Sequence, residues 1–223
     1  MRGLYDFIVE PVGGRYDNIK KINDQELILN TQIFHHQYVN RKARVLSIPI
    51  LINTNIQVGD MVVVHHNIFR RWHDIRGKEK NSKSYINENT YAVREDQIFA
   101  YKRDKLENTN TCGGGISTHV DGEWKSTPGY CFVKPIKSNN KLNIEQERPL
   151  VGIMKYTNKD LPDINNGDLI GFTPDSEYEF IIDGERLYRV LINSISIKYE
   201  YQGDEEEYNP SWTQSGGGIN KSC

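Results

Sequence analysis

Six histidines are the residues in this chain best suited to bind a metal ion. Four of them form adjacent pairs, in "FHHQ" (His35, His36) and "VHHN" (His65, His66), and the others are His73 and His119. Imidazole is a common ligand of zinc and copper. Neighbouring side chains of a strand point to opposite faces, so each pair offers one ligand in each direction. No Cys-x-x-Cys or His-Glu-x-x-His motif accompanies them. We therefore expect no metal site.

Catalytic and cofactor-binding motifs are missing from the sequence. "CGGGIS" (112–117) is glycine-rich but lacks the Gly-Lys-Ser/Thr ending of a phosphate-binding loop. The serines, cysteines and histidines show neither a nucleophile elbow nor a triad signature. We predict that the chain is not an enzyme and binds no cofactor.

The segment "FRRWHDIRGKEK" (69–80) combines cationic and aromatic residues. Arg70, Arg71, Trp72 and Arg76 have the chemistry to hold single-stranded RNA or an acidic partner surface. The net charge of the whole chain is −2, which gives no electrostatic footprint of nucleic-acid binding. We favour a solvated insertion loop and expect neither nucleic acid nor a membrane as a partner.

An aliphatic tripeptide, Leu27, Ile28 and Leu29, stands in the polar stretch "NDQELILNTQIFHHQYVNRK" (23–42). Two interpretations are open from the residues alone. The tripeptide is either a short core strand or an apolar plug that is held out for a partner.

Length and composition suit a globular protein of one large domain or two small ones. The chain has 223 residues, of which 37% are hydrophobic and 26% are charged. No apolar run is long enough for a signal peptide, and none approaches the roughly 20 residues of a membrane span. The three cysteines are an odd number at irregular spacing, which argues against a disulfide framework. We expect a reducing, cytoplasmic compartment.

Four segments of the first half recur in the same order in the second half, which predicts an internal repeat. The matching pairs are "FIVEPV" (7–12) with "CFVKPI" (131–136), "ARVLSIPI" (43–50) with "PLVGIMKY" (149–156), "VGDMVVV" (58–64) with "NGDLIGF" (166–172), and "TYAVREDQIFAY" (90–101) with "LYRVLINSISIK" (187–198).

The spacing between these segments shows that the first half carries two insertions. Pro11 and Gly59 are 48 positions apart, whereas Pro135 and Gly167 are 32 apart. The first insertion therefore has about 16 residues and contains the tripeptide. A second insertion of about 11 residues falls within 67–89, because the distance from the Gly-Asp pair to the next Tyr is also longer in the first half.

The pattern predicts an all-β fold of two tandem small antiparallel β-barrels. "SISIKYE" alternates apolar and polar residues, and Asp183-Gly184 between two apolar-rich runs is a strong hairpin signal. We expect a first barrel at 1–104, a linker rich in Gly, Asn and Thr at 105–128, a second barrel at 129–200 and an acidic, Gly-rich tail at 201–223.

The first half resembles the GroES-like co-chaperonin (chaperonin-10) family. Members of this family have five features in a fixed order. They are a strand of the type hDhhhV, where h is an apolar residue, a mobile loop with an aliphatic tripeptide, a strand like GEVLAVG, a VGDhVhh segment and a closing strand. The corresponding segments here are "LYDFIVEPV", "ELILNTQIFHHQYVNRK", "ARVLSIP", "VGDMVVV" and "TYAVREDQIFAYKR". The second half resembles the same strands but lacks the loop.

This resemblance implies a function in protein folding. Leu27, Ile28 and Leu29 would be the partner-binding residues, docking in an apolar groove of a GroEL-type chaperonin that itself binds the ATP. The chain would form a homo-heptameric ring in the cytoplasm, joined through the outer strands "LYDFIVEPV" and "QIFAYKR". Its composition, rich in Asn, Ile, Lys and Tyr, is typical of an AT-rich genome such as that of some viruses. The alternative is a small-barrel structural or assembly protein, for example of a phage particle, with no chaperonin partner.

Overall fold

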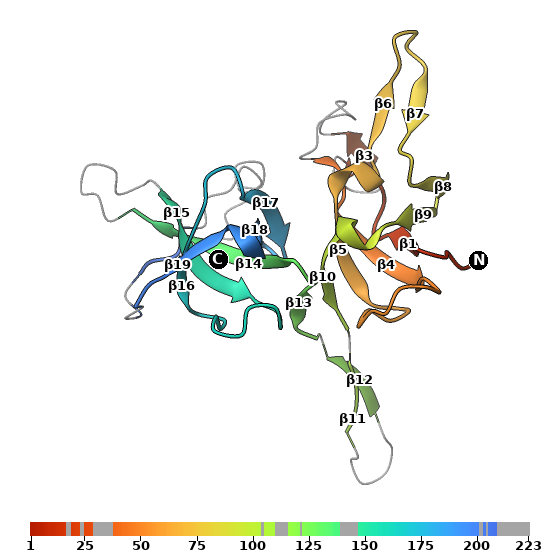
Figure 1. Cartoon of the computed structure of the whole chain (residues 1–223). Helices are drawn as coiled ribbons and strands as arrows, with labels where there is room; N and C mark the ends of the chain where they lie inside the picture. The colour runs from red at the N-terminus through yellow and green to blue at the C-terminus, as the bar shows by residue number, and fades with distance from the viewer. Residues whose placement is uncertain are drawn as a thin grey trace. The chain divides into compact units, whose positions relative to one another are not determined.

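The computed structural model describes residues 1–16, 19–22, 25–28, 38–103, 105–109, 116–120, 122–138, 147–200, 203 and 205–208. For 19–22, 25–28, 105–109 and 116–120 it describes the backbone alone. The chain forms two compact units, Met1–Trp124 and Lys125–Cys223 (Figure 1), and the boundary between them falls inside the segment predicted as a linker. The predicted all-β class is confirmed, since the described elements are antiparallel strands and short 3-10 helices. No described helix is long and apolar enough to cross a membrane.

A strongly paired antiparallel sheet organises the first unit. Its strand order is β13-β10-β5-β4-β1-β9-β8. The strands are β1 (Phe7–Pro11), β4 (Lys42–Ser47), β5 (Met61–Val64), β8 (Tyr85–Asn87), β9 (Thr90–Val93), β10 (Ile98–Lys102) and β13 (Trp124–Ser126), the strand in which the first unit ends. Alternating side chains such as Val9, Val45 and Val62 are buried in one core with Phe7 and Tyr91.

Three further hairpins pair outside this sheet. They are β2 (Ile19–Ile22) with β3 (Gln25–Ile28), β6 (Arg71–His73) with β7 (Glu79–Asn81), and β11 (Lys105–Thr109) with β12 (Ile116–Val120). The first two of these hairpins lie in the two insertions that distinguish the first half of the sequence from the second.

The second unit contains a six-stranded antiparallel sheet in the order β17-β18-β14-β15-β16-β19. The strands are β14 (Tyr130–Lys137), β15 (Glu147–Tyr156), β16 (Leu169–Phe172), β17 (Tyr178–Ile182), β18 (Glu185–Leu191) and β19 (Ile195–Lys198). Asp183 and Gly184 join β17 to β18 with positive φ angles of 51° and 83°. The predicted Asp-Gly hairpin is therefore confirmed.

The internal repeat is present in the structure as well as in the sequence. Read from one end, the order β10-β5-β4-β1-β9-β8 of the first unit corresponds strand by strand to β19-β16-β15-β14-β18-β17 of the second. A 3-10 helix precedes the last strand in both units, η3 (Glu95–Gln97) before β10 and η4 (Ile192–Ser194) before β19. Two segments of different sequence thus follow one folding pattern.

Equivalent Gly-Asp turns precede the equivalent strands β5 and β16 of the two sheets. Gly59 and Gly167 have φ angles of 93° and 96°, which side chains with a Cβ rarely adopt. The amide of Gly59 donates to the Val45 carbonyl at 2.8 Å, and that of Gly167 donates to the Met154 carbonyl at 2.7 Å. These turns were expected from the sequence, and the structure confirms them.

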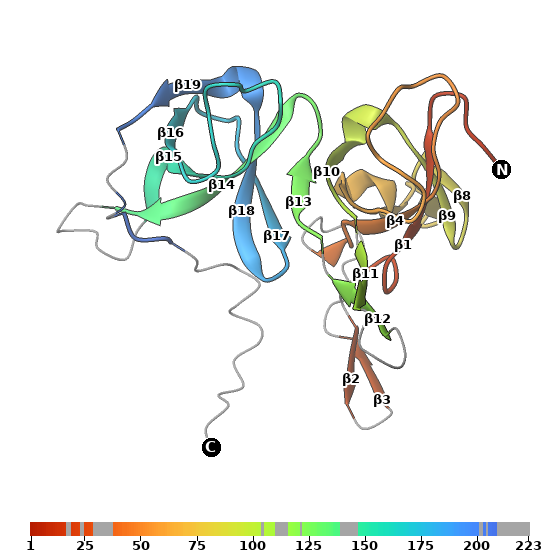
Figure 2. The ribbon, with the colours of Figure 1, turned by 90° about the horizontal axis from the view of Figure 1, so that it is seen from below.

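Both sheets curl strongly (Figure 2), but among the described strands neither closes on itself. In the second unit, Leu191 at the end of β18 and Ile195 at the start of β19 are four residues apart. Four extended residues span at most about 14 Å. In a flat sheet the four strand spacings from β18 to β19 would need about 19 Å, so the sheet must bend to bring these strands near each other.

Strands β1 and β10, which were predicted to join neighbouring subunits, lie inside the described sheet. Strand β1 lies between β4 and β9, and β10 lies between β5 and β13. Neither strand is an edge strand of its sheet. The second pairing of β1 covers Phe7 to Val9, whereas Glu10 and Pro11 pair with β4 alone. The predicted association of subunits stays a prediction.

Candidate partner-binding site

The predicted partner-binding tripeptide begins on β3, in a hairpin of its own. Leu27 and Ile28 are the last two residues of β3, and they pair with Lys20 and Ile19 of β2. In the described backbone, β2 and β3 pair only with each other and not with the seven-stranded sheet (Figure 2). Leu29 lies outside the described residues, and the side chains of β2 and β3 are also outside them. That these residues bind a partner stays a prediction.

A buried asparagine ties together the two ends of the insertion that contains this hairpin. The Asn40 side chain is 3% exposed. Its Nδ2 donates to the carbonyls of Val12 at 2.8 Å and Gly14 at 2.6 Å, and its Oδ1 accepts from the Lys42 amide at 2.8 Å. An isolated bridge between Tyr16 and Val39 adds to this closure. The chain therefore leaves the sheet and returns to it at one place. Asn40 and its partners Val12, Gly14 and Lys42 are here called the clasp.

The second insertion is anchored to residues beside the clasp. Arg15 donates from Nε to the Phe69 carbonyl at 3.2 Å and from Nη2 to Oδ1 of Asn81 at 2.9 Å. The hydroxyl of Tyr16 accepts from the Arg71 amide at 2.6 Å, and the Arg71 guanidinium lies 5.1 Å from the centre of the Tyr16 ring. Both insertions of the first half thus share one base, although the residues that these bonds join are 54 to 66 positions apart in the sequence.

Hairpin β6–β7 (Figure 1) ends in a turn that is held by several hydrogen bonds and contains an apolar residue. Oδ1 of Asp74 accepts from the amides of Arg76 and Lys78, both at 2.9 Å. These bonds hold the pKa of Asp74 below its ordinary value. Ile75 in this turn is fully exposed, and Trp72 on β6 is 39% exposed. The exposed Ile and Trp are presented on a defined backbone, as in a preorganised binding element.

The hairpin together with the residues that flank it carries a positive charge. Between positions 70 and 83 the chain has six Lys or Arg residues and two acidic residues, Asp74 and Glu79. Two ion pairs stay within the hairpin, Arg71 with Glu79 at 3.1 Å and Lys80 with Asp74 at 3.7 Å. Arg76, Lys78 and Lys83 are exposed. A partner that contacts this hairpin should therefore present acidic groups.

The histidines do not form a metal site among the described residues. No group of three or more His, Cys, Asp or Glu side chains there has metal-binding geometry. His65 stacks on His66 with ring centres 4.2 Å apart, and its Nδ1 accepts from the Asn67 amide at 3.1 Å. His65 thus has a structural role at the start of the 3-10 helix η2 (His66–Ile68). His35 and His36 lie outside the described residues.

Sequence reasoning located the tripeptide and both insertions but missed the residues that join them. Asn40, Arg15 and Tyr16 are single polar residues without a recognisable motif, so no local signal marked their role. For Ile75, the sequence showed only an apolar residue within a charged segment. Its exposure depends on the turn that Asp74 and Gly77 form.

Two hairpins of the first unit, β2–β3 and β6–β7, therefore share one base. Comparison with known proteins adds no assignment to this geometry. The chain matches no protein-family model and no curated protein sequence.

Proposed function

We propose that this chain is a co-chaperonin that caps a GroEL-type chaperonin when the partner has bound nucleotide, and so assists protein folding in the cytoplasm. One observation carries the proposal. The segment with Leu27 and Ile28 leaves the sheet at the Asn40 clasp and pairs only within its own described hairpin. Among its described residues, the second unit builds the same strand order without a separate hairpin at the equivalent place. A segment that the repeated fold does not need is available for a partner.

The chemistry of the tripeptide suits a lid that must bind and release. Burying three aliphatic side chains yields roughly 5–9 kcal/mol before costs. Ordering the segment and fixing two bodies in place removes most of this gain. One segment alone should therefore bind weakly. Several segments on one ring bind together, because each later contact is intramolecular.

By analogy with the family, we propose that the two curled sheets act as tandem GroES-like barrels and that seven chains form the ring. Only the first unit would contact the chaperonin. The second unit would add mass to the cap without adding an anchor. In β1, Phe7 to Val9 are already paired with β9, so neighbouring chains could meet along β1 only beyond Val9, or through other surfaces.

Native mass spectrometry with a GroEL-type chaperonin tests the proposal. The protein should form a complex with the chaperonin in the presence of ATP and none without nucleotide. Ile28→Asp should weaken this complex at least about tenfold, because a carboxylate is costly to bury in an apolar groove. Ile75→Asp makes the same change at a fully exposed position of the other hairpin and is the matched control. Equal binding by wild type and Ile28→Asp, with both proteins folded, would contradict the proposal.

The second candidate is an assembly protein that binds a structural partner rather than a chaperonin. Hairpin β6–β7 favours it, since this hairpin presents Ile75 and Trp72 on a clamped, basic scaffold. In that case no chaperonin complex forms with any nucleotide. Ile75→Asp would then disturb assembly, and Ile28→Asp would leave it unchanged.

A further inference from the structure

A short acidic segment near the C-terminus is bound to the second unit as an added strand. This segment, Glu205–Tyr208, is here called the strap. The Lys137 amide donates to the Glu206 carbonyl at 2.8 Å, and the Tyr208 amide donates to the Pro135 carbonyl at 2.9 Å. Ile136 and Glu207 form the antiparallel bridge between these two bonds. The sequence suggested a tail from residue 201 onward, and the described part of that tail is paired with β14.

The strap occupies an edge of β14 that the neighbouring strand leaves open. Strand β18 pairs with β14 from Tyr130 to Val133, whereas β15 continues along its other edge as far as Lys137. Beyond Val133 the β18 edge of β14 would expose backbone groups. An open edge of this kind accepts an additional strand from the same chain or from another one.

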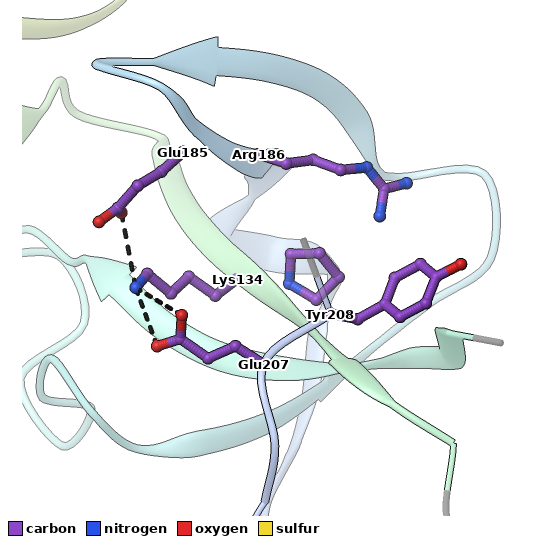
Figure 3. Close-up of a pocket in the computed structure, with 6 residues that line it drawn as sticks. Lys134, Glu185, Arg186, Glu207 and Tyr208 are labelled. Carbon is purple, nitrogen blue, oxygen red and sulfur yellow. Dashed lines mark hydrogen bonds and ion pairs between the residues drawn. The ribbon is translucent and has the colours of Figure 1, made fainter. Parts of the chain in front are cut away.

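Two lysines of β14 pair with acidic side chains of the strap, and Figure 3 shows one of them, Lys134. Nζ of Lys134 lies 2.9 Å from Oε1 of Glu207 and 3.5 Å from Oε2 of Glu185, and its side chain is 15% exposed. Burial opposes the charge of Lys134, but the hydrogen bond from its ammonium to Glu207 and the charges of both glutamates outweigh burial and raise its pKa. Lys137 pairs with Glu206 and holds the pKa of that carboxyl below its ordinary value.

Arg186, beside the strap, is held in place by two carboxylates of the second unit. Arg186 donates from Nη1 to Glu147 and from Nε to Glu179, both at 2.8 Å, so its guanidinium is fixed by the second unit itself. The Tyr208 ring lies near this guanidinium, 5.9 Å from it. A small hollow of about 20 Å³ lies among Lys134, Pro135, Glu185, Arg186, Glu207 and Tyr208.

The strap itself is held loosely compared with this preformed groove. Its two anchoring carboxylates are mostly solvent-exposed, 70% for Glu206 and 55% for Glu207, and exposed ion pairs stabilise little. Glu206 and Glu207 are exposed, and Tyr208 is only partly buried. A similar segment from another molecule could make the same bonds, so exchange requires no change in the sheet.

We propose that the β14 edge is a binding groove for an acidic, extended peptide of a partner protein, and that the strap is its exchangeable resident occupant. The partner segment would carry two adjacent carboxylates for Lys134 and Lys137, followed by an aromatic residue for the face near Arg186. The backbone bonds would supply pairing, and the lysines would supply selection for acidic sequence. This proposal is independent of the chaperonin-binding proposal, since it concerns the second unit alone.

A fluorescent peptide with the sequence of residues 203–210, GDEEEYNP, is the probe. In the full-length double variant Glu206→Lys, Glu207→Lys, the strap is repelled by Lys134 and Lys137, and the groove is open. Fluorescence anisotropy should show that the peptide binds this variant at least about tenfold more tightly than wild type, where the attached strap competes at high effective concentration. A scrambled peptide of the same composition is the control for unspecific attraction.

A reversed pair of charges provides a second arm. The full-length variant Lys134→Glu, Lys137→Glu should bind a GDEKKYNP peptide and reject GDEEEYNP. In the wild-type protein, which needs no substitution to test, excess GDEEEYNP should speed hydrogen exchange at the Tyr208 amide. Peptide binding no tighter than that of the scrambled control, or a Tyr208 amide that keeps its protection, would overturn the proposal. Concentration-dependent dimers of the wild-type protein that excess GDEEEYNP separates would do so as well, because the groove would then serve the strap of a second copy.

Discussion

Replacing Asn40 by alanine tests whether the clasp holds the ends of the first insertion. The substitution removes two bonds from Nδ2 to the carbonyls of Val12 and Gly14 and one bond to Oδ1 from the Lys42 amide. Each intramolecular hydrogen bond contributes about 1 kcal/mol, and a buried partner left without a bond costs about 1–3 kcal/mol. Water can reach part of the opened site, so we expect the free energy of unfolding of the first unit to fall by about 2–4 kcal/mol.

Hydrogen exchange resolved to single amides is the assay, because it separates the first unit from the second. Protection should fall at the amides of Val12, Asn40 and Lys42 in the variant and stay unchanged at Met154 in the second unit. Asn53→Ala, at an exposed position, is the matched control and should change the stability by less than about 0.5 kcal/mol. An Asn40→Ala protein as stable as this control would refute the clasp.

Two further predictions concern the equivalent turns and the buried thiol. Asp60 is 3% exposed and accepts two bonds from Arg103 at 2.9 and 2.8 Å, whereas its counterpart Asp168 is 23% exposed and pairs with Lys198 at 2.7 Å. In urea titrations, Asp60→Asn should therefore cost about 2–3 kcal/mol and Asp168→Asn about 1 kcal/mol or less, and the reverse order would contradict the assignment. Lys198 and the Asn165 amide lower the pKa of Asp168, so the advantage of wild type over Asp168→Asn should be complete well above 3.8, the ordinary pKa, and disappear as the pH falls through the lowered value. Burial raises the pKa of the Cys131 thiol to about 12, so wild type and Cys131→Ser should take up equal amounts of a thiol reagent at pH 8 when folded and differ by one group in denaturant. Rapid loss of the Cys131 thiol in the folded protein would contradict its burial.

The repeated fold was largely predictable from the sequence, because its signals are local. The Gly-Asp and Asp-Gly turns require positive φ angles, and the strands beside them are the most apolar runs in the chain. Equal order of these segments in both halves was sufficient to predict equal strand order. The exception is Ile197, an apolar residue of the alternating segment "SISIKYE" that is nevertheless 47% exposed.

Long-range partners were not predictable, because nothing in a single sequence marks them. From the sequence, the carboxylates of the strap were interpreted as part of an acidic tail. In the structure they pair with Lys134 and Lys137 of β14. The segment predicted as a linker contains β11, β12 and β13, and β13 covers the edge of β10 that was expected to be open. Composition alone cannot distinguish a Gly-rich coil from a segment whose ends form strands.

The candidate partner-binding site likewise has a part that the sequence predicted and a part that it did not. The tripeptide was found from its three adjacent aliphatic residues, and the insertion around it from comparison of the two halves. The clasp and the shared base depend on contacts of Arg15, Tyr16 and Asn40 with residues of both insertions. Such contacts between distant polar side chains and backbone carbonyls leave no periodic or compositional pattern.

The most direct test of the central claim is native mass spectrometry of the full-length protein mixed with a GroEL-type chaperonin. We predict a ring of identical chains that joins the chaperonin when ATP is present, and loss of that complex in Ile28→Asp but not in Ile75→Asp. A wild-type protein that stays apart from the chaperonin in every nucleotide state would contradict the claim.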